Sequence, residues 1–291
     1  MPPQRTLKVW GVPEHFNVPW LHSLEELRTT GVDVQWTEAK GGTGEMVGAL
    51  RDGKADVALL LTEGAVKAAV ETPAQVTIVG LYVTSPLVWA VLVGAKSDVS
   101  SLANKSPQTV RFAISRKGSG SHLMAMVLAK QLGWDPSALR FLEVGTLDNA
   151  RAEMAKHNDV VFMWEKAMTQ PFVTRNELKR IGQVPTPWPC FVVAANPKSL
   201  VTKADAVGKA LAVVRKTCVA FKADKEAALS TIVNKFHLEK ESAAEWFDKV
   251  EFASKPGIPP RVLDPVYSAL ADLGQVPKDG KTDVSKLVSK L

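Results

Sequence analysis

The feature that most constrains the fold of this chain is an alternation of apolar strand-like runs with amphipathic helix-like runs. The first series has strand patterns at residues 7–11, 32–37, 55–61 and 76–83, and helix patterns at 18–29, 43–51 and 63–71. Strands that alternate with helices predict a mostly parallel sheet covered by helices. We therefore expect an α/β fold.

The alternation starts again after an apolar run at residues 87–93. Strand patterns follow at 110–114, 141–144 and 159–164, with helix patterns at 121–132 and 147–157. A further apolar run at 188–195 is placed where the chain would cross back, and helix patterns follow at 204–221, 225–236, 242–249 and 259–273. We predict two α/β lobes joined by two crossing strands that act as a hinge. Lobe I comprises residues 1–88 and 191–291, and lobe II comprises 89–190.

Composition limits the function classes. The 291 residues suffice for about two lobes. The net charge is +6, but the lysines are scattered among acidic residues, which argues against a nucleic-acid partner. The chain has no export signal, no apolar run of ~18 residues that would insert into a membrane, and only two cysteines. We expect a cytoplasmic protein, or a periplasmic one if a leader has been removed, with a membrane permease as partner only in the exported case.

In open α/β sheets, ligands bind beyond the carboxyl ends of the strands. The residues just after the predicted strands are therefore the candidate ligand-binding residues. They are Glu14, His15, Phe16, Thr62, Glu63, Gly64, Thr84, Ser85, Gly118, Ser119, Gly120, Ser121, His122, Trp164 and Glu165.

The junction at residues 115–122 carries the clearest chemistry. Its small residues let the backbone approach a ligand, the first helix amides have no intrahelical partners, and Arg116 and Lys117 add positive charge. These properties favour an anion site, although such loops also serve simply to turn a chain. Leu123 stands where a dinucleotide fingerprint has its third glycine, and no Lys-Ser/Thr pair follows, so neither NAD nor ATP is indicated.

Each other candidate also has a structural interpretation. Thr62 and Glu63 can cap a helix, and Glu165 can pair with Lys166 or Arg175. Trp164 suits either the core or stacking on a flat ligand, and His15 and His122 suit capping or core roles as well as ligand contact. No Ser-His-Asp set, metal site or cofactor site can be assembled, because the remaining histidines lack the spacing that such sites need.

Several motifs together resemble type II periplasmic binding proteins. They are Gly44-x-Met46, Ala49-Leu50, Gly53-x-Ala55-Asp56-Val57-Ala58, Thr62-Glu63-Gly64, residues 115–122, Phe162-Met163-Trp164-Glu165 and Met168-Thr169-x-Pro171-Phe172. Within that fold the chain is most similar to the nitrate, sulfonate and thiamine-pyrimidine branch, and to its leaderless eukaryotic members, over residues 5 to 200. The resemblance implies the two-lobe fold and a solute-binding protein like those of ABC transporters.

One enzyme of that branch, the thiamine-pyrimidine synthase, binds pyridoxal phosphate through a lysine and sacrifices its own histidine. The matching positions here lie near Thr62 and Val66, so the amine is missing, and Cys190 alone cannot replace that enzyme's cysteine cluster.

We therefore expect binding of one small polar, anionic or heteroaromatic molecule between the lobes, without catalysis and without a cofactor. Two alternatives remain open. One is an enzyme of thiamine-pyrimidine or pyridoxal phosphate chemistry. The other is a regulatory protein that keeps the fold, with Trp164 and Trp188 as plugs of the cleft.

Overall fold

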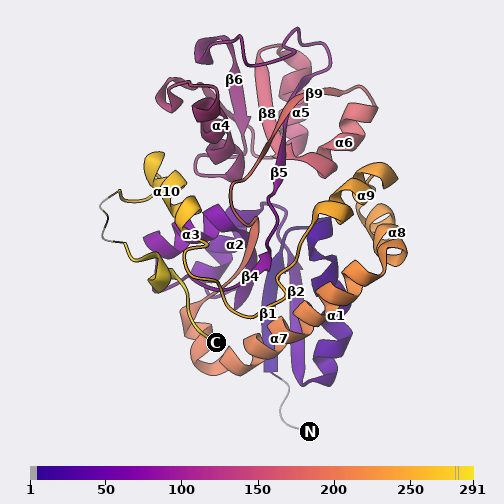
Figure 1. Cartoon of the computed structure of the whole chain (residues 1–291), viewed down its shortest axis with the longest axis vertical. Helices are drawn as coiled ribbons and strands as arrows, with labels where there is room; N and C mark the ends of the chain where they lie inside the picture. Colours follow the sequence, from indigo (N-terminus) through magenta and orange to yellow (C-terminus); the bar gives the residue numbers. More distant parts are fainter. Residues whose placement is uncertain (1–4, 279, 281) are drawn as a thin grey trace. The chain divides into compact units, whose positions relative to one another are not determined.

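The chain forms two compact units, each with its own sheet. The computed structural model describes residues 5–278, 280 and 282–291. Lobe I comprises the described residues of Met1–Pro86 and Pro187–Leu291, and lobe II is Leu87–Thr186. In Figure 1, lobe I therefore combines the indigo start of the chain with its orange and yellow end. The chain passes between the units twice, at 86/87 and at 186/187.

The sheet of lobe I has five strands in the order β2-β1-β3-β10-β4. They are β1 (Arg5–Gly11), β2 (Val32–Glu38), β3 (Val57–Leu61), β4 (Thr77–Val83) and β10 (Phe191–Ala195). β1 is parallel to β2 and β3, whereas β10 is antiparallel to β3 and β4. Four of the five strands thus run in one direction, as a mostly parallel sheet requires, and the strand that returns from lobe II enters between β3 and β4 in the opposite direction.

Helices from both ends of the chain belong to lobe I. They are η1 (His15–Asn17), α1 (Val18–Thr29), α2 (Thr43–Arg51), α3 (Thr62–Glu71), α7 (Pro197–Ala223), α8 (Lys225–Phe236), α9 (Lys240–Lys249), α10 (Asp264–Asp272) and η4 (Val284–Leu287). Capping interactions fix the ends of some of these helices. The Asp224 side chain accepts a hydrogen bond from the Ala227 amide at the start of α8, and His237 ends that helix in the left-handed conformation.

A buried carboxylate fixes the start of α7 on the sheet. Asp56, just before β3, accepts hydrogen bonds from the Lys8 amide at 2.8 Å, the Ser199 hydroxyl at 2.7 Å and the Lys203 ammonium at 2.7 Å. Burial raises the pKa of Asp56, but the bonds from Lys203, Lys8 and Ser199 outweigh burial and hold the pKa below its ordinary value. Asp56 therefore ties β1, β3 and α7 together as an ion.

The sheet of lobe II has the order β7-β6-β8-β5-β9. Its strands are β5 (Val88–Gly94), β6 (Arg111–Ile114), β7 (Phe141–Glu143), β8 (Val160–Glu165) and β9 (Leu178–Pro185). β6 is parallel to β7 and β8, and β5 is antiparallel to β8 and β9. Ala90, Leu92 and Phe162 are fully buried in the core of this lobe, so lobe II has a hydrophobic core of its own.

The helices of lobe II include one α-helix that the sequence pattern does not predict. They are η2 (Pro107–Thr109), α4 (Gly120–Gln131), η3 (Pro136–Ala138), α5 (Leu147–Lys156) and α6 (Lys166–Thr174). The sequence pattern predicts neither α6, which contains Pro171, nor the strand β9, in which buried and exposed residues mix. Both elements lie in the interval between the predicted strand at 159–164 and the apolar run at 188–195.

The two ends of lobe II are hydrogen-bonded to each other. The Thr186 amide donates to the Leu87 carbonyl at 2.9 Å, and the Leu87 amide donates to the Thr186 hydroxyl at 3.0 Å. The contiguous segment Leu87–Thr186 therefore enters and leaves its lobe at one place.

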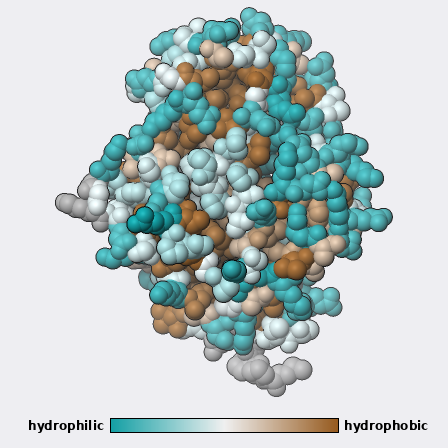
Figure 2. All heavy atoms as spheres, in the orientation of Figure 1, coloured by the Kyte–Doolittle hydropathy of each residue, from teal (hydrophilic) through white to brown (hydrophobic). Residues whose placement is uncertain are grey.

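Hydrophilic side chains cover much of the visible face of both lobes (Figure 2). This distribution agrees with the scattered charges of the sequence. Among the described residues, no helix has both the length and the apolar character needed to cross a membrane.

Candidate functional site

The predicted residues of lobe II follow two neighbouring parallel strands. Ser115 comes directly after β6, and Glu165 is the last residue of β8. Because β6 and β8 are adjacent and parallel, their carboxyl ends lie at the same edge of the sheet. The turn at 115–122 and the pair Trp164–Glu165 therefore lie at one sheet edge, as strand order predicts for a ligand site.

Three serine hydroxyls organise the turn at 115–122, which we call the serine turn. The Ser121 hydroxyl accepts from the Ser115 amide at 2.9 Å and lies 3.0 Å from the Ser119 hydroxyl and 3.2 Å from the Ser115 hydroxyl. Ser119 and Ser121 are buried, and Gly118 has a φ of 76°, a conformation that suits glycine. The small residues are thus needed for the shape of the turn.

The helix α4 that follows the turn has only part of its N-terminal amides satisfied. The His122 amide donates to the Ser119 hydroxyl at 3.3 Å, and the Leu123 amide donates to the Ser119 carbonyl at 3.0 Å. The amides of Gly120 and Ser121 have no acceptor among the residues that the structure describes. The imidazole of His122 accepts from the Gly118 amide through Nδ1 at 3.0 Å and packs on Phe141. An anion at this turn would therefore find two amide donors.

Glu165 is a buried carboxyl at the start of α6. Its Oε2 accepts from the Met168 amide at 2.7 Å, so it is the N-cap of that helix. Burial raises the pKa of Glu165 to about 7, although the helix amides, the Met168 amide first among them, oppose the rise. Trp164 is half-buried and stacks on Phe162, with ring centroids 5.4 Å apart.

In lobe I, the predicted residues follow strands that also end at one edge. β1 and β3 are parallel neighbours, and β4 has the same direction because β10 is antiparallel to both β3 and β4. Glu14, Thr62 and Thr84 come soon after the ends of these three strands. The predicted residues 14–16, 62–64 and 84–85 therefore all follow strands that end at this edge of the sheet.

Thr62 and Glu63 bind the segment by which the chain returns from lobe II. The Thr62 hydroxyl donates to the Pro189 carbonyl, and the Trp188 indole N–H donates to Glu63 Oε2 at 3.0 Å. The other carboxyl oxygen of Glu63 is buried without a partner. Burial raises the pKa of Glu63 to about 7, against the lowering effects of its own amide and the Trp188 indole. From the sequence, Trp188 was expected only as a possible plug of the cleft, and no sequence pattern indicates its bond to Glu63.

Gly64 is required by close packing of two helices. A Cβ atom at this position would lie 2.3 Å from Cγ2 of Thr43, the first residue of α2. The glycine therefore lets the starts of α2 and α3 approach each other, and this contact explains the residue without a ligand.

His15 and Phe16 lie inside an aromatic cluster. His15 is fully buried, with its ring centroid 4.3 Å from Trp246, 4.7 Å from Phe16 and 6.3 Å from Phe236. Neither imidazole nitrogen has a hydrogen-bond partner, and burial lowers the pKa of His15 to about 3. Glu14, the residue before this cluster, is half-buried.

Thr84 and Ser85 anchor the segment after α9. The Thr84 amide donates to the Glu251 carbonyl at 2.8 Å, and the Glu251 amide donates to the Ser85 hydroxyl at 3.1 Å. The Ser85 carbonyl also accepts from the Cys190 amide at 3.1 Å. Ligand contact by the predicted residues of both lobes stays a prediction.

The comparisons with known proteins agree with this architecture. The model of the Ca3427-like periplasmic-binding-protein family matches residues 89–184. The solved structure of the Candida albicans CA3427 gene product, which defines a family with the generic periplasmic-binding-protein fold, is 27% identical, with a TM-score of 0.88 over 98% of this chain and 96% of that chain. The chain has the type II periplasmic-binding-protein fold, and its residues 89–184 match the Ca3427-like family.

Bacterial proteins share the type II fold at lower identity. The alkanesulfonate-binding protein SsuA of Xanthomonas axonopodis pv. citri, bound to MOPS, is 18% identical, with a TM-score of 0.81 and full coverage of both chains. The ligand-binding component of an ABC-type import system of Staphylococcus aureus, with zinc bound, is 14% identical, with a TM-score of 0.76 over 99% of this chain and 97% of that chain. No curated protein matches the chain. Proteins with this fold therefore include ones that bind small solutes.

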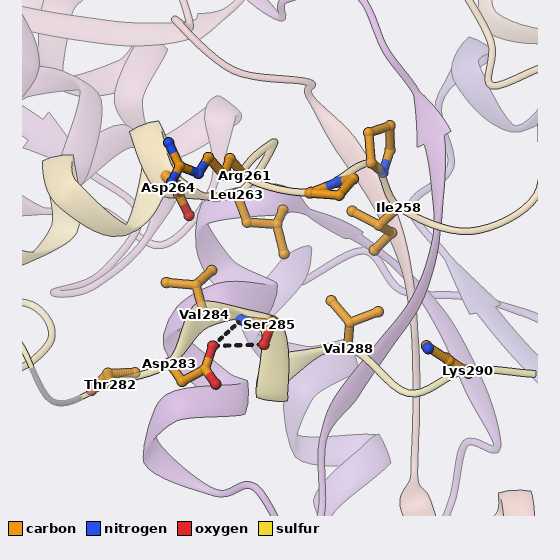
Figure 3. A pocket seen from close by; sticks show the side chains of 12 residues that line it. Ile258, Arg261, Leu263, Asp264, Thr282, Asp283, Val284, Ser285, Val288 and Lys290 are labelled. Carbon is orange, nitrogen blue, oxygen red and sulfur yellow. Dashed lines mark hydrogen bonds between the residues drawn. The ribbon is translucent and has the colours of Figure 1, made fainter.

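Two hollows lie within the individual lobes and involve none of the predicted residues. The hollow of lobe I measures about 540 Å³, and Ile258, Leu263, Val284 and Val288 line it, with Arg261 and Lys290 among its charged residues (Figure 3). The hollow of lobe II measures about 430 Å³ and is lined in part by Lys96, Arg151 and Glu177. Within the described part of the chain, no three His, Cys, Asp or Glu side chains are grouped so that they could hold a metal ion.

Proposed function

We propose that this protein binds one small polar molecule with an anionic group, without catalysing its conversion. The observation that carries the proposal is the serine turn, in which buried serines and a glycine set up the start of α4 and leave the amides of Gly120 and Ser121 without an acceptor in the described part of the chain. Arg116 and Lys117 in the same turn add positive charge.

A sulfonate is the anionic group that we favour. A relative with this fold is named as an alkanesulfonate-binding protein and was solved with MOPS, whose sulfonate is an anion. We propose the same class of group here, because backbone amides and hydroxyls suit an anion that accepts several hydrogen bonds.

We propose further that lobe I contributes acceptors for the polar remainder of the ligand. Glu14, Thr62 and Glu63 follow strand ends of that lobe, as the serine turn and Glu165 do in lobe II. A ligand with both an anionic group and donor groups, such as an amino-sulfonate or a pyrimidine-like ring, fits this division of roles. The interlobe position expected from the sequence remains a prediction.

Thermal-shift measurements with MOPS, other sulfonates and pyrimidines test this function on protein shown by native mass spectrometry to be ligand-free. A ligand at about 100 times its Kd adds about 2.7 kcal/mol of stability. We expect a sulfonate to raise Tm, and the double variant Arg116→Gln/Lys117→Gln to weaken its binding. Lys156→Gln, which removes one positive charge at the end of α5, serves as the control for a general effect of charge. No shift with any sulfonate, or equal affinity in the double variant, would contradict the proposal.

A further inference from the structure

Three hydrogen bonds join the chain, as it returns from lobe II into lobe I, to the start of α3. The Trp188 indole donates to Glu63 Oε2, the Thr62 hydroxyl donates to the Pro189 carbonyl, and the Thr62 amide donates to the Cys190 carbonyl at 3.0 Å. Trp188 is 3% exposed and Glu63 is 3% exposed. Residues 188–190, which we call the return segment, therefore lie against the first residues of α3.

The return segment is also bonded to the outgoing chain. The Cys190 amide donates to the Ser85 carbonyl, and Ser85 lies two residues before lobe II begins. A bond that holds the return segment on α3 therefore also holds Ser85, so it restrains the lobe I residues next to both points where the chain passes between the lobes.

Of these fastenings, only the bond from Trp188 depends on a group that can change its charge. Glu63 Oε1 is buried without a partner, and Oε2 has the single donor of Trp188 besides the residue's own amide. An ionised carboxylate with an oxygen left unpaired inside a protein is costly. Burial accordingly raises the pKa of Glu63 to about 7.

The charged groups around Glu63 do not compensate for this cost. Lys67, one turn further along α3, donates to Gln275 and pairs with Glu71. Glu45 of the neighbouring helix α2 accepts from the Gly41 amide. Within the described residues, burial and hydrogen bonds account for the shift at Glu63, and no charged side chain contributes to it.

We propose that Glu63 is a proton-sensitive latch for the return segment: as a neutral carboxyl it holds Trp188 and the following residues on α3, and as an ionised carboxylate it releases them. The neutral group can remain in its apolar surroundings, whereas the ionised group gains by opening toward water. The latch acts within lobe I, so the inference does not depend on the ligand proposed above.

Hydrogen exchange of the amides of Thr62 and Cys190 tests the latch without any ligand. For a carboxyl that titrates near its ordinary value when the latch is open and near 7 when it is closed, opening becomes about tenfold more favourable between about pH 6 and about pH 8. We expect exchange at both amides, corrected for its intrinsic pH dependence, to quicken about tenfold over this range. Glu63→Gln, which keeps an acceptor for Trp188 and stays neutral, should abolish the change.

Glu165→Gln is the matched control. Glu165 is equally buried and also has a raised pKa, but it caps its own helix in lobe II and does not bind the return segment. This variant should keep the tenfold change at Cys190. The Val193 amide in β10 is the reference for global unfolding, which also frees Glu63, so it should exchange more slowly than the Cys190 amide at both pH values.

Three results would overturn the latch. They are a pH-independent exchange at Cys190 in the unmodified protein, persistence of the tenfold change in Glu63→Gln, and an equal opening free energy at Cys190 and Val193, which would mean that only global unfolding exposes Cys190. Trp188→Phe adds a second variant, which keeps an aromatic ring and removes the donor. It should speed exchange at Cys190 even near pH 6, and unchanged protection would exclude the indole bond as the fastening.

Discussion

Single residues in this protein show how burial decides chemistry that the sequence leaves open. Three ionisable side chains near strand ends, His15, Glu63 and Glu165, are each at most 6% exposed. Burial favours the neutral form of all three groups. It lowers the pKa of the His15 imidazole to about 3 and raises the pKa of both carboxyls to about 7. The sequence placed these residues at strand ends correctly, but it could not say how far the surrounding aromatic and apolar side chains close over them.

His15 predicts a loss of stability in acid. Because its pKa falls to about 3 in the folded protein, the unfolded chain binds a proton below about pH 6.5 and the folded protein does not. Between about pH 7.5 and about pH 5 this residue should cost about 2 kcal/mol of unfolding free energy. His15→Phe should remove that loss, which urea unfolding of both proteins at the two pH values measures.

The buried carboxyls of Glu63 and Glu165 have the opposite pH dependence. Because their pKa values are raised in the folded protein, they contribute stability at pH values below the ordinary carboxyl pKa, and this stability is lost as the pH rises through about 7. The comparison must therefore be made between His15→Phe and the unmodified chain at each pH. An identical acid loss in both would show that His15 is already paired or hydrated.

At the scale of elements, periodicity located most strands and helices. The predicted helices at 18–29 and 43–51 are α1 and α2 with the same bounds. The apolar run at 188–195 gave a strand only from Phe191, because Trp188 and Pro189 are used to bind α3 instead of a neighbouring strand. β9 was missed because long-range pairing with β5, which a local pattern does not contain, holds it in the sheet.

Packing of α2 on α3 predicts opposite effects for two glycines. Gly64→Ala should destabilise the protein by about 1–3 kcal/mol, because the new methyl group would meet Thr43 at 2.3 Å. Gly48→Ala, within α2 and facing open space, should stabilise it by up to about 1 kcal/mol. Chemical denaturation of both variants checks the pair, and a destabilised Gly48→Ala would contradict this account.

The attachment of α7 predicts a large effect at Asp56. Asp56→Asn leaves Lys203 without its counter-charge and weakens the bonds from Ser199 and Lys8, so we expect a loss of about 3 kcal/mol or more. Asp52→Asn breaks only an exposed pair with Lys54 and should change stability by less than about 1 kcal/mol. Equal Tm values for the two variants would show that Asp56 does not anchor α7.

At the scale of the whole molecule, the protein is one lobe interrupted by another. All five strands of the second sheet and a core of fully buried residues lie inside Leu87–Thr186. The sequence predicted the two-lobe fold because the strand and helix alternation restarts. It placed the boundaries a few residues later, since apolar character alone does not tell which lobe a connecting residue packs on.

Residues 87–186 expressed alone should fold. We expect a cooperative urea transition and dispersed amide resonances, because the core and the bonds between Leu87 and Thr186 remain in place. The fragment 89–190 should be less stable, since it loses Leu87 and carries Trp188 and Cys190, which are buried in lobe I. An unfolded 87–186 fragment would contradict the independence of this lobe.

The joined ends of lobe II have a consequence for how such proteins diversify. An inserted lobe whose first and last residues are in contact can be removed, or replaced by a related lobe, without separating the two chain ends that it leaves in lobe I. Recombination at the two passages would then exchange the predicted contact residues of lobe II in a single step and leave those of lobe I in place. If the proposed function holds, chimaeras that exchange this lobe between distant members of the fold should differ in the solute that they bind.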